Sequence, residues 1–258
     1  MDDVVVSNVS VAHGGRTIIP NISFSLKRGE LCGLIGANGV GKTTLLRAVI
    51  GLETQYRGSI LLAGREIRSL SQYERASWFA YLPQKRDAFV TGLTVAQVVE
   101  SGLVRFVRGF RGLDAAQRRT IDRAISLAGI DRLSDRFFDE LSGGEQQKVL
   151  IASALAQGAR YLILDEPTTF LDLTSAHGIM QLLRELILHE GVGVWVVCHD
   201  VSLILAYGDR VLAISREGGL FRGTPAELSG SEILTSLYGQ PLRMIPDPLN
   251  RFPCIVPQ

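Results

Sequence analysis

One glycine-rich loop constrains this chain more than any other stretch of its sequence. It reads Gly36-Ala37-Asn38-Gly39-Val40-Gly41-Lys42-Thr43. This spacing of glycines, lysine and hydroxyl is the pattern that holds a nucleoside triphosphate with its Mg²⁺. The preceding residues 30–35 are apolar, as in a buried strand, and residues 42–50 carry apolar side chains at helical spacing. The loop is therefore predicted to join a strand to a helix and to bind phosphate; a glycine-rich turn of no special role is the alternative.

Each residue type in this loop has a chemical reason to be there. Glycines let the backbone fold around the phosphates with its N–H groups inward, and the helix N-terminus adds partial positive charge. Lys42 is predicted to reach the outer phosphates, Thr43 to ligate Mg²⁺, and Thr44 to add a phosphate contact. The predicted nucleotide-binding residues of the loop are Gly36, Asn38, Gly39, Gly41, Lys42, Thr43 and Thr44.

Composition and charge narrow the classes of protein further. At 258 residues, with 46% hydrophobic and 21% charged residues, the chain can fold as one domain or as a core with a subdomain. Its formal charge of +1 is too small for a general nucleic-acid binder, so we expect no nucleic-acid partner. Three cysteines far apart in the sequence suit a reducing compartment. The acidic N-terminus and the lack of an apolar run of about 18–20 residues predict a soluble, cytoplasmic chain.

The pattern of the sequence changes twice along the chain. Residues 1–30 have turn signals at residues 13–15 and 20–21, which predict two or three short antiparallel strands. Residues 88–150 are helical by their three- and four-residue apolar spacing. Strand-like runs then alternate with helical segments, which favours a largely parallel sheet with helices on both faces. These runs are residues 161–164, 192–198 and 211–214.

The same patterns predict how the chain is divided. We expect a single domain over residues 1–258, built from a nucleotide-binding core, an inserted helical subdomain and a proline-rich C-terminal tail that covers the core. The core is predicted to comprise residues 1–87 with 151–220, the helical subdomain residues 88–150, and the tail residues 221–258.

A second candidate site follows the run 161–164, where Asp165 and Glu166 stand side by side. Ligands of parallel sheets bind outside the carboxyl ends of the strands. Two adjacent acids near a polyphosphate are costly unless they have a role. We predict that Asp165 joins the Mg²⁺ shell and that Glu166 is the general base, polarising the water that attacks the γ-phosphate. The alternative is an acidic pair that caps the helix after Pro167.

A third motif carries a family resemblance. It is Leu141-Ser142-Gly143-Gly144-Glu145. Together with the phosphate loop and the run Leu164-Asp165-Glu166-Pro167, it resembles the ATP-binding cassette family of transport ATPases over nearly the whole chain. The resemblance implies an α/β fold, with a P-loop NTPase core of mostly parallel sheet, an N-terminal antiparallel β subdomain and an inserted α-helical subdomain. It also implies ATP and Mg²⁺ as cofactors.

The resemblance also implies a homodimer. In the family, the positions of Ser142 and Gly144 contact the γ-phosphate bound by the other subunit, so that two copies close head-to-tail around two ATP molecules. Taken alone, a serine with two glycines at a helix start can bind a phosphate or merely cap the helix. Asp172 resembles the aspartate that couples the two nucleotide sites across the dimer.

Three further side chains take expected roles from the family. Gln84 resembles the glutamine that reaches Mg²⁺ and the attacking water; a loop-capping amide is the alternative. His199 resembles the switch histidine that contacts the γ-phosphate. His13 stands where the family stacks an aromatic ring on adenine, although imidazole stacks less well; a turn histidine without function is the alternative. The expected catalytic residues are Glu166, His199 and Gln84, and the expected metal ligands are Thr43, Gln84 and Asp165.

Finer sequence features resemble one branch of the family. Residues 93–100, 168–172 and 247–253 resemble importers of siderophore iron, haem and vitamin B12. That branch implies a separate transmembrane permease, an extracytoplasmic solute-binding protein as an indirect partner, and a peripheral location on the cytoplasmic face of the inner cell membrane. Residues 87–100 are the expected docking surface for the permease. Arginines between residues 105 and 123 favour a solvated basic face over contact with anionic headgroups or the permease.

Two alternatives from other classes remain. A soluble ATP-binding cassette ATPase of iron–sulfur cluster assembly would use the same site without a permease, whereas repair members of the family carry long coiled-coil insertions that this sequence lacks. A catalytically idle regulatory cassette commonly loses the glutamate or the histidine, and both Glu166 and His199 are present here. Selectivity for the solute resides in the permease and the external binding protein, so the sequence does not name it.

Overall fold

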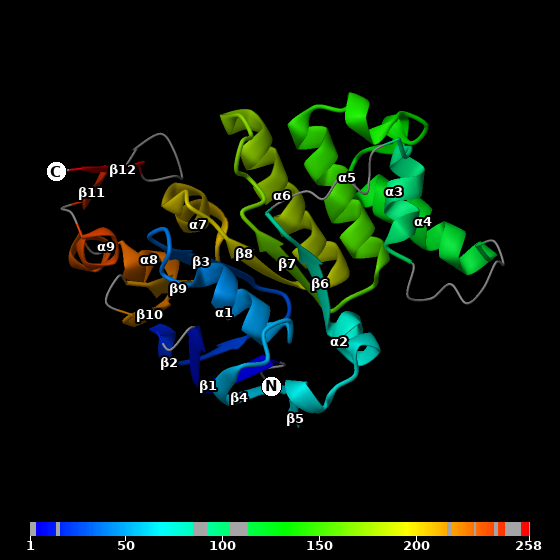
Figure 1. Cartoon of the computed structure of the whole chain (residues 1–258). Helices are drawn as coiled ribbons and strands as arrows, with labels where there is room; N and C mark the ends of the chain where they lie inside the picture. Colours follow the sequence, from blue (N-terminus) through cyan, green and yellow to red (C-terminus); the bar gives the residue numbers. More distant parts are fainter. Residues whose placement is uncertain are drawn as a thin grey trace.

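A computed structural model describes most of the chain (Figure 1). The described residues are 4–13, 16–84, 92–103, 113–215, 218–229, 231–239, 242–245 and 254–257. Its strands are β1 Val4–His13, β2 Arg16–Leu26, β3 Leu31–Gly36, β4 Tyr56–Leu62, β5 Arg65–Glu66, β6 Phe79–Leu82, β7 Tyr161–Asp165, β8 Gly193–Val197, β9 Arg210–Ile214, β10 Leu220–Gly223, β11 Leu242–Ile245 and β12 Cys254–Pro257. Its α-helices are α1 Lys42–Val49, α2 Gln72–Trp78, α3 Val95–Ser101, α4 Ala115–Leu127, α5 Gly143–Ala156, α6 Leu173–Glu190, α7 Val201–Tyr207, α8 Pro225–Leu228 and α9 Ser231–Tyr238.

A six-stranded sheet in the order β10-β9-β3-β8-β7-β6 carries the fold. Strands β6, β7, β8, β3 and β9 are parallel, and β10 pairs antiparallel with β9 at one edge. Helices connect most of the parallel strands, as crossovers between parallel neighbours require. Figure 1 shows α5 and α6 on one face of this sheet and α1 with the N-terminal strands on the other. The predicted α/β fold is confirmed.

The central strands are apolar throughout because both of their faces are covered. Strand β8 shows this well: Val194 and Val196 join the core under α5 and α6, while Trp195 and Val197 join the core that includes α1. All five residues of β8 are buried. The two cores therefore pack on both faces of the sheet and fix the positions of the residues that follow the carboxyl ends of its strands.

The antiparallel N-terminal sheet is larger than predicted. Its order is β2-β1-β4-β5, so half of its strands follow the phosphate loop and α1 in the sequence. The predicted break at Pro20-Asn21 is wrong, because β2 runs through both residues without interruption. Strand β2 is at the edge of the sheet, where a proline without an N–H group is tolerated. The turn signal was therefore an edge-strand signal.

Helices α3, α4 and α5 form the described part of the predicted helical region and lie together at one end of the molecule (Figure 1). Helix α5 continues beyond the predicted boundary at residue 150, to Ala156. The predicted tail likewise begins inside the core, because β10 extends the central sheet. Both predicted boundaries fall inside an element, because the composition of the sequence changes within α5 and within β10 rather than at their ends. Among the described residues, no helix is both long and apolar enough to span a membrane.

Candidate active site

The phosphate loop connects β3 to α1, as the sequence predicts. Gly36 has a φ of 149°, and a Cβ there would lie 2.5 Å from the carbonyl oxygen of Ile214, so glycine is required. Gly41 is the N-cap of α1, with a φ of 98° and no side-chain cap. The first-turn N–H groups of α1 are therefore not capped by the Gly41 residue and suit an anion at this helix start.

Lys42 is buried, and its ammonium group lies inside the loop. Its Nζ donates to the carbonyl oxygens of Gly36 and Ala37, at 2.9 Å and 3.0 Å. An ammonium has three N–H donors, so a third can reach a phosphate oxygen while these two bonds hold. Burial lowers the pKa of Lys42, and the carboxylates of Glu166 and Asp165 oppose that effect. The cation is thus held by the loop and by the acids that follow β7.

Thr43 and Asp165 form the best candidate for a magnesium site. The Thr43 hydroxyl donates to Asp165, with Oγ1 at 3.1 Å from Oδ2 and 3.3 Å from Oδ1. Tyr81 also donates to Oδ2 of Asp165, at 3.4 Å. A hydroxyl beside a carboxylate is a donor set of hard oxygens that suits Mg²⁺ completed by phosphate and water. A bound Mg²⁺ would neutralise charge between the outer phosphates.

Burial shifts the pKa values of Asp165 and Tyr81. It raises the pKa of Asp165, which is buried in the structure, against the opposing hydrogen bond from Thr43. It also raises the pKa of Tyr81 to about 12, so that Tyr81 stays a neutral donor. Ionised Asp165 therefore costs folding free energy, a cost that a bound cation would offset.

Asp165→Asn should stabilise the apo chain at high pH. The folded-state pKa of Asp165 is raised, so the cost of its charge is absent below the ordinary value of 3.8 and grows as pH rises through the folded-state value. We expect a melting temperature about 2–4 °C above wild type at pH 8, equivalent to about 1 kcal/mol. The gain should shrink toward pH 4.5. Thermal unfolding across this pH range measures it, with the exposed Asp135→Asn as control; no gain at pH 8 would contradict the pKa shift.

Glu166 is held by three side chains. Nε2 of Gln84 donates to Oε2, the Thr169 hydroxyl donates to the same oxygen at 3.1 Å, and Nε2 of His199 lies against Oε1. The carboxylate is largely buried, with 9% of the side chain exposed, whereas His199 is 41% exposed. Glu166 has a φ of 56°, in the left-handed region that a non-glycine residue rarely adopts. The carboxylate is therefore fixed in direction at a strained backbone position.

Strand order explains why these residues meet. Gln84, Glu166 and His199 follow β6, β7 and β8, which are adjacent parallel strands. Their carboxyl ends are in register, with Leu82 opposite Leu164 and Asp165 opposite Val197. The backbone N–H of Glu166 donates to Val197 at 3.0 Å, which extends the pairing by one residue. The sheet thus brings together residues that are over a hundred positions apart in sequence.

Thr169 was not among the residues predicted from the sequence, and on the basis of its hydrogen bond to Glu166 we propose a positioning role for it. Thr169→Val should lower kcat about 10- to 150-fold, because one hydrogen bond to a charged group is worth roughly 1.5–3 kcal/mol. KM for ATP should stay near the wild-type value. Steady-state kinetics measures both, and Thr169→Ser, which keeps the hydroxyl, should restore kcat. Equal kcat in the valine variant and wild type would contradict this role.

The residues expected to act across a dimer cap helices within the chain. Ser142 accepts from the N–H of Glu145 and donates to its carboxylate, so Ser142 caps α5. Asp172 caps α6 through Ser175, and this hydrogen bonding lowers the pKa of Asp172. The predicted capping alternative therefore holds for Ser142, and a phosphate contact from a second copy stays a prediction.

A pocket of about 560 Å³ is shared by the residues that follow the parallel strands and by residues 141–145, the signature motif. Its lining includes Gln84, Asp165 and Glu166 together with Gly143. A Cβ on Gly144 would lie 3.0 Å from Oγ of Ser175, so this glycine permits close packing of α5 on α6. Asn38 and Gly39 are exposed in the phosphate loop, and Thr44 is half-buried.

Some predictions fall outside the described part of the chain. The side chain of His13 is one, so its stacking on adenine stays a prediction. The first residues of the expected docking surface, 87–91, and the arginines of residues 105–112 also lie outside it. Tyr81 and Thr169 are the site residues that the sequence analysis missed. Their signals were present, because Tyr81 ends a strand-like run beside Gln84 and Thr169 lies three residues after Glu166.

Comparison with known proteins places this geometry in a family. Residues 19–169 match the model of the ABC transporter domain, a span that includes the phosphate loop, the signature motif and Glu166. The chain belongs to the ABC transporter family. ATP-binding proteins of this family are ATPases coupled to transport, so the predicted enzyme class is confirmed.

Several curated relatives match over nearly the full length. The achromobactin transport ATP-binding protein of Dickeya dadantii is 34% identical over 257 residues, covering 100% of this chain and 95% of the relative. The iron(3+)-hydroxamate import ATP-binding protein of Bacillus subtilis is 32% identical and covers 98% and 94%. The hemin import ATP-binding protein of Rhodococcus jostii is 34% identical and covers 97% and 84%. The predicted resemblance to the metal-chelate branch is confirmed.

Solved structures agree with the fold. An inward-facing metal-chelate type ABC transporter matches with a TM-score of 0.86 and 23% identity, covering 100% of this chain and 98% of that one. The protein cbiO1 of Clostridium perfringens, part of an ABC transporter complex, matches with a TM-score of 0.77 and 28% identity, covering 90% and 92%. The N-terminal sheet, central sheet and helical region of this chain are therefore those of an ABC ATPase.

Proposed function

We propose that this chain is the ATP-hydrolysing subunit of a bacterial ABC importer for a metal chelate such as siderophore-bound iron, haem or cobalamin. Two copies would close on ATP and drive uptake through a separate transmembrane permease. The observation that carries the hydrolytic part is the Glu166 carboxylate held by Gln84, Thr169 and His199 beside Lys42 and Thr43. The import of a metal chelate is supported by the names of relatives that match over nearly the whole chain.

The chain's own residues divide the proposed reaction among them. Lys42 and the first turn of α1 would bind the outer phosphates, and Thr43 with Asp165 would hold Mg²⁺. Glu166 would orient and deprotonate the attacking water, with its direction set by Thr169 and His199. Gln84 would couple nucleotide binding at this site to the position of the helical region, since Gln84 and Gly143 line the same pocket.

Exposed apolar side chains beside the site support the homodimer. Phe170 is 97% exposed with a φ of 68°, and Leu173 is 72% exposed. They flank Asp172, the residue proposed to couple the two sites. A large aromatic ring held in a strained, fully exposed position gains free energy when a partner surface covers it.

Phe170→Ser should therefore weaken ATP-dependent dimerisation at least tenfold, because each Phe contributes roughly 1.5–3 kcal/mol on burial. Analytical ultracentrifugation with ATP measures this in a Glu166→Gln background, in which turnover does not consume the ligand. Leu188→Ser is the control, since Leu188 is 73% exposed on α6 but lies well away from Asp172 in the sequence. Equal dissociation constants for the parent and Phe170→Ser would contradict a role for Phe170 at the interface.

The permease, the membrane location and the solute are tested together. A tagged chain is used to pull down partners from detergent-solubilised membranes of its source organism, and mass spectrometry identifies them. Retention of a many-helix permease supports the importer, and the identity of that permease narrows the solute. Recovery of soluble iron–sulfur assembly proteins alone would overturn transport and leave the ATPase intact.

The proposed docking surface on α3 provides a matched pair of variants. Glu100→Lys reverses an exposed charge within this surface, and Glu185→Lys makes the same change on the exposed face of α6. Only Glu100→Lys should reduce permease recovery. Equal recovery with both variants would place the docking surface elsewhere.

A further inference from the structure

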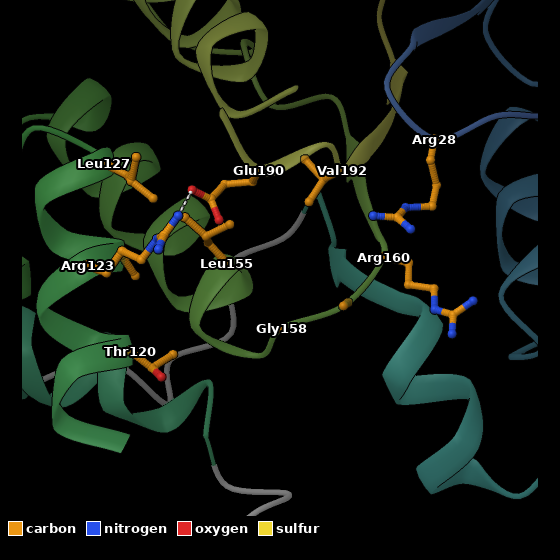
Figure 2. Close-up of a pocket in the computed structure, with 11 residues that line it drawn as sticks. Arg28, Thr120, Arg123, Leu127, Leu155, Gly158, Arg160, Glu190 and Val192 are labelled. Atoms are coloured by element: carbon orange, nitrogen blue, oxygen red, sulfur yellow. Dashed lines mark hydrogen bonds and ion pairs between the residues drawn. The ribbon is translucent and has the colours of Figure 1, made fainter. Parts of the chain in front are cut away.

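A second pocket lies at the edge of the sheet opposite the active site. Its volume is about 400 Å³, and Figure 2 shows the side chains around it. Arg160 and Val192 precede β7 and β8, whereas Glu166 and His199 follow these strands. Each strand has five residues, so roughly 17 Å of sheet separates this pocket from the active site. It is a separate site.

The walls of the pocket carry an excess of positive charge. Arg28, Arg123 and Arg160 line it together with a single acid, Glu190. The chain as a whole has a formal charge of only +1, so these arginines form a local concentration. Helices α4, α5 and α6 all end here, and each helix C-terminus contributes about half a negative charge. About half a positive charge therefore remains uncompensated after the three helix ends and Glu190 are counted.

The three arginines differ in their partners. Arg123 of α4 pairs with Glu190 at 2.7 Å, and Arg160 stacks on the ring of Trp78, 4.1 Å from its centroid. Arg28 makes no ion pair or side-chain hydrogen bond to any residue that the structure describes. Figure 2 shows Arg28 and Arg160 on one side of the opening and Arg123 with Glu190 on the other. Arg28 is thus the guanidinium most available to a ligand.

The rest of the lining is apolar. Ala124, Ala159 and Val192 are buried, and Leu127 and Leu155 are half-buried around the same space. A pocket of this size falls in the range of small-molecule sites, in which an apolar wall holds the body of a ligand and a few polar groups fix its orientation. Guanidinium groups bind phosphate oxygens through paired N–H donors.

We propose that this pocket binds a phosphate ester, with the phosphate on Arg28 and the organic portion against Leu127 and Leu155. Because α4 forms one wall and the core forms the other, the ligand would join the helical region to the core. The phosphate ester can come from a soluble metabolite or from an anionic lipid headgroup, since both present the same chemistry. This inference does not depend on the proposed transport function.

Calorimetric titration with phenyl phosphate tests the site on the full chain. Arg28→Gln should weaken binding about tenfold, as expected for loss of one charge-assisted contact. Arg132→Gln, an exposed arginine outside the pocket, should bind as wild type. Unchanged melting temperature in Arg28→Gln establishes that the variant is folded. Equal affinity in Arg28→Gln and Arg132→Gln would overturn the proposal.

The phosphate loop is a competing site for the probe, so the titration is repeated in a Lys42→Ala background. Binding that persists there and is lost on adding Arg28→Gln supports the second pocket. Binding that is lost with Lys42→Ala alone rules out a soluble phosphate ester in this pocket and leaves the proposed nucleotide site standing.

A vesicle arm separates the two sources of the phosphate ester. The chain is cosedimented with vesicles of phosphatidylcholine and phosphatidylglycerol. If the chain binds these vesicles but not phenyl phosphate, and if Arg28→Gln abolishes vesicle binding while Arg132→Gln does not, the ligand is a lipid headgroup. Phenyl phosphate binding by the chain in solution identifies a soluble ligand. Failure of both arms overturns the proposal.

Discussion

Glu166→Gln is expected to retain ATP binding and to lose ATP turnover by a factor of about 10²–10⁴, the range of a general base. Glutamine has nearly the same shape, and its amide oxygen can still accept from Thr169 or Gln84. The phosphate loop and Lys42 are untouched, so ground-state binding should survive. What is lost is the negative charge that His199 contacts and that would accept a proton from water.

Phosphate release at saturating ATP measures turnover, and a fluorescence or calorimetric titration measures binding. Glu185→Gln, an exposed glutamate on α6, makes the same chemical change away from the site and should leave both unchanged. Normal steady-state hydrolysis by Glu166→Gln would refute the assignment of the base. Loss of binding as well would mean that Glu166 orders the phosphate loop through Lys42, with which it interacts electrostatically.

Much of this site could be predicted because its residues stand in short motifs that can be recognised from the local sequence. The glycines at 36 and 41 need special backbone conformations, and Asp165 and Glu166 directly follow a buried strand. Each of these two motifs spans only a few residues, so the spacing of residues within it is enough to find it. Strands β3, β7, β8 and β9 of the central sheet could be predicted for the same reason, because each is a short apolar run whose residues are nearly all buried.

The parts that were missed depend on contacts distant in sequence. Strands β4 and β5 join the N-terminal sheet only because β4 pairs with β1, about fifty residues earlier in the sequence. Pro20 reads as a turn unless one knows that β2 is an edge strand. Thr169 reads as one residue of a loop, and its role appears only when the left-handed backbone at Glu166 turns the carboxylate toward it. Single-chain spacing carries no information about such pairings.

Lys42→Ala should weaken nucleotide binding about 10- to 150-fold, the equivalent of roughly 1.5–3 kcal/mol for a lost charge-assisted contact. The mechanism differs from that of Glu166→Gln, because Lys42 contacts the ground-state phosphates. The measurement is an equilibrium titration with ATP and Mg²⁺, and Arg47→Ala, an exposed cation on the same helix, is the matched control.

The stability of this variant separates binding from folding. Lys42 is buried, and burial lowers its pKa, so the charge of Lys42 destabilises the folded chain. The hydrogen bonds to Gly36 and Ala37 offset only part of this cost. Removing the ammonium removes that cost, so the apo variant should melt at or above the wild-type temperature. Weak binding with undiminished thermal stability therefore assigns Lys42 to the ligand; weak binding with a lowered melting temperature would instead assign it to the architecture of the loop. Wild-type affinity would contradict both roles.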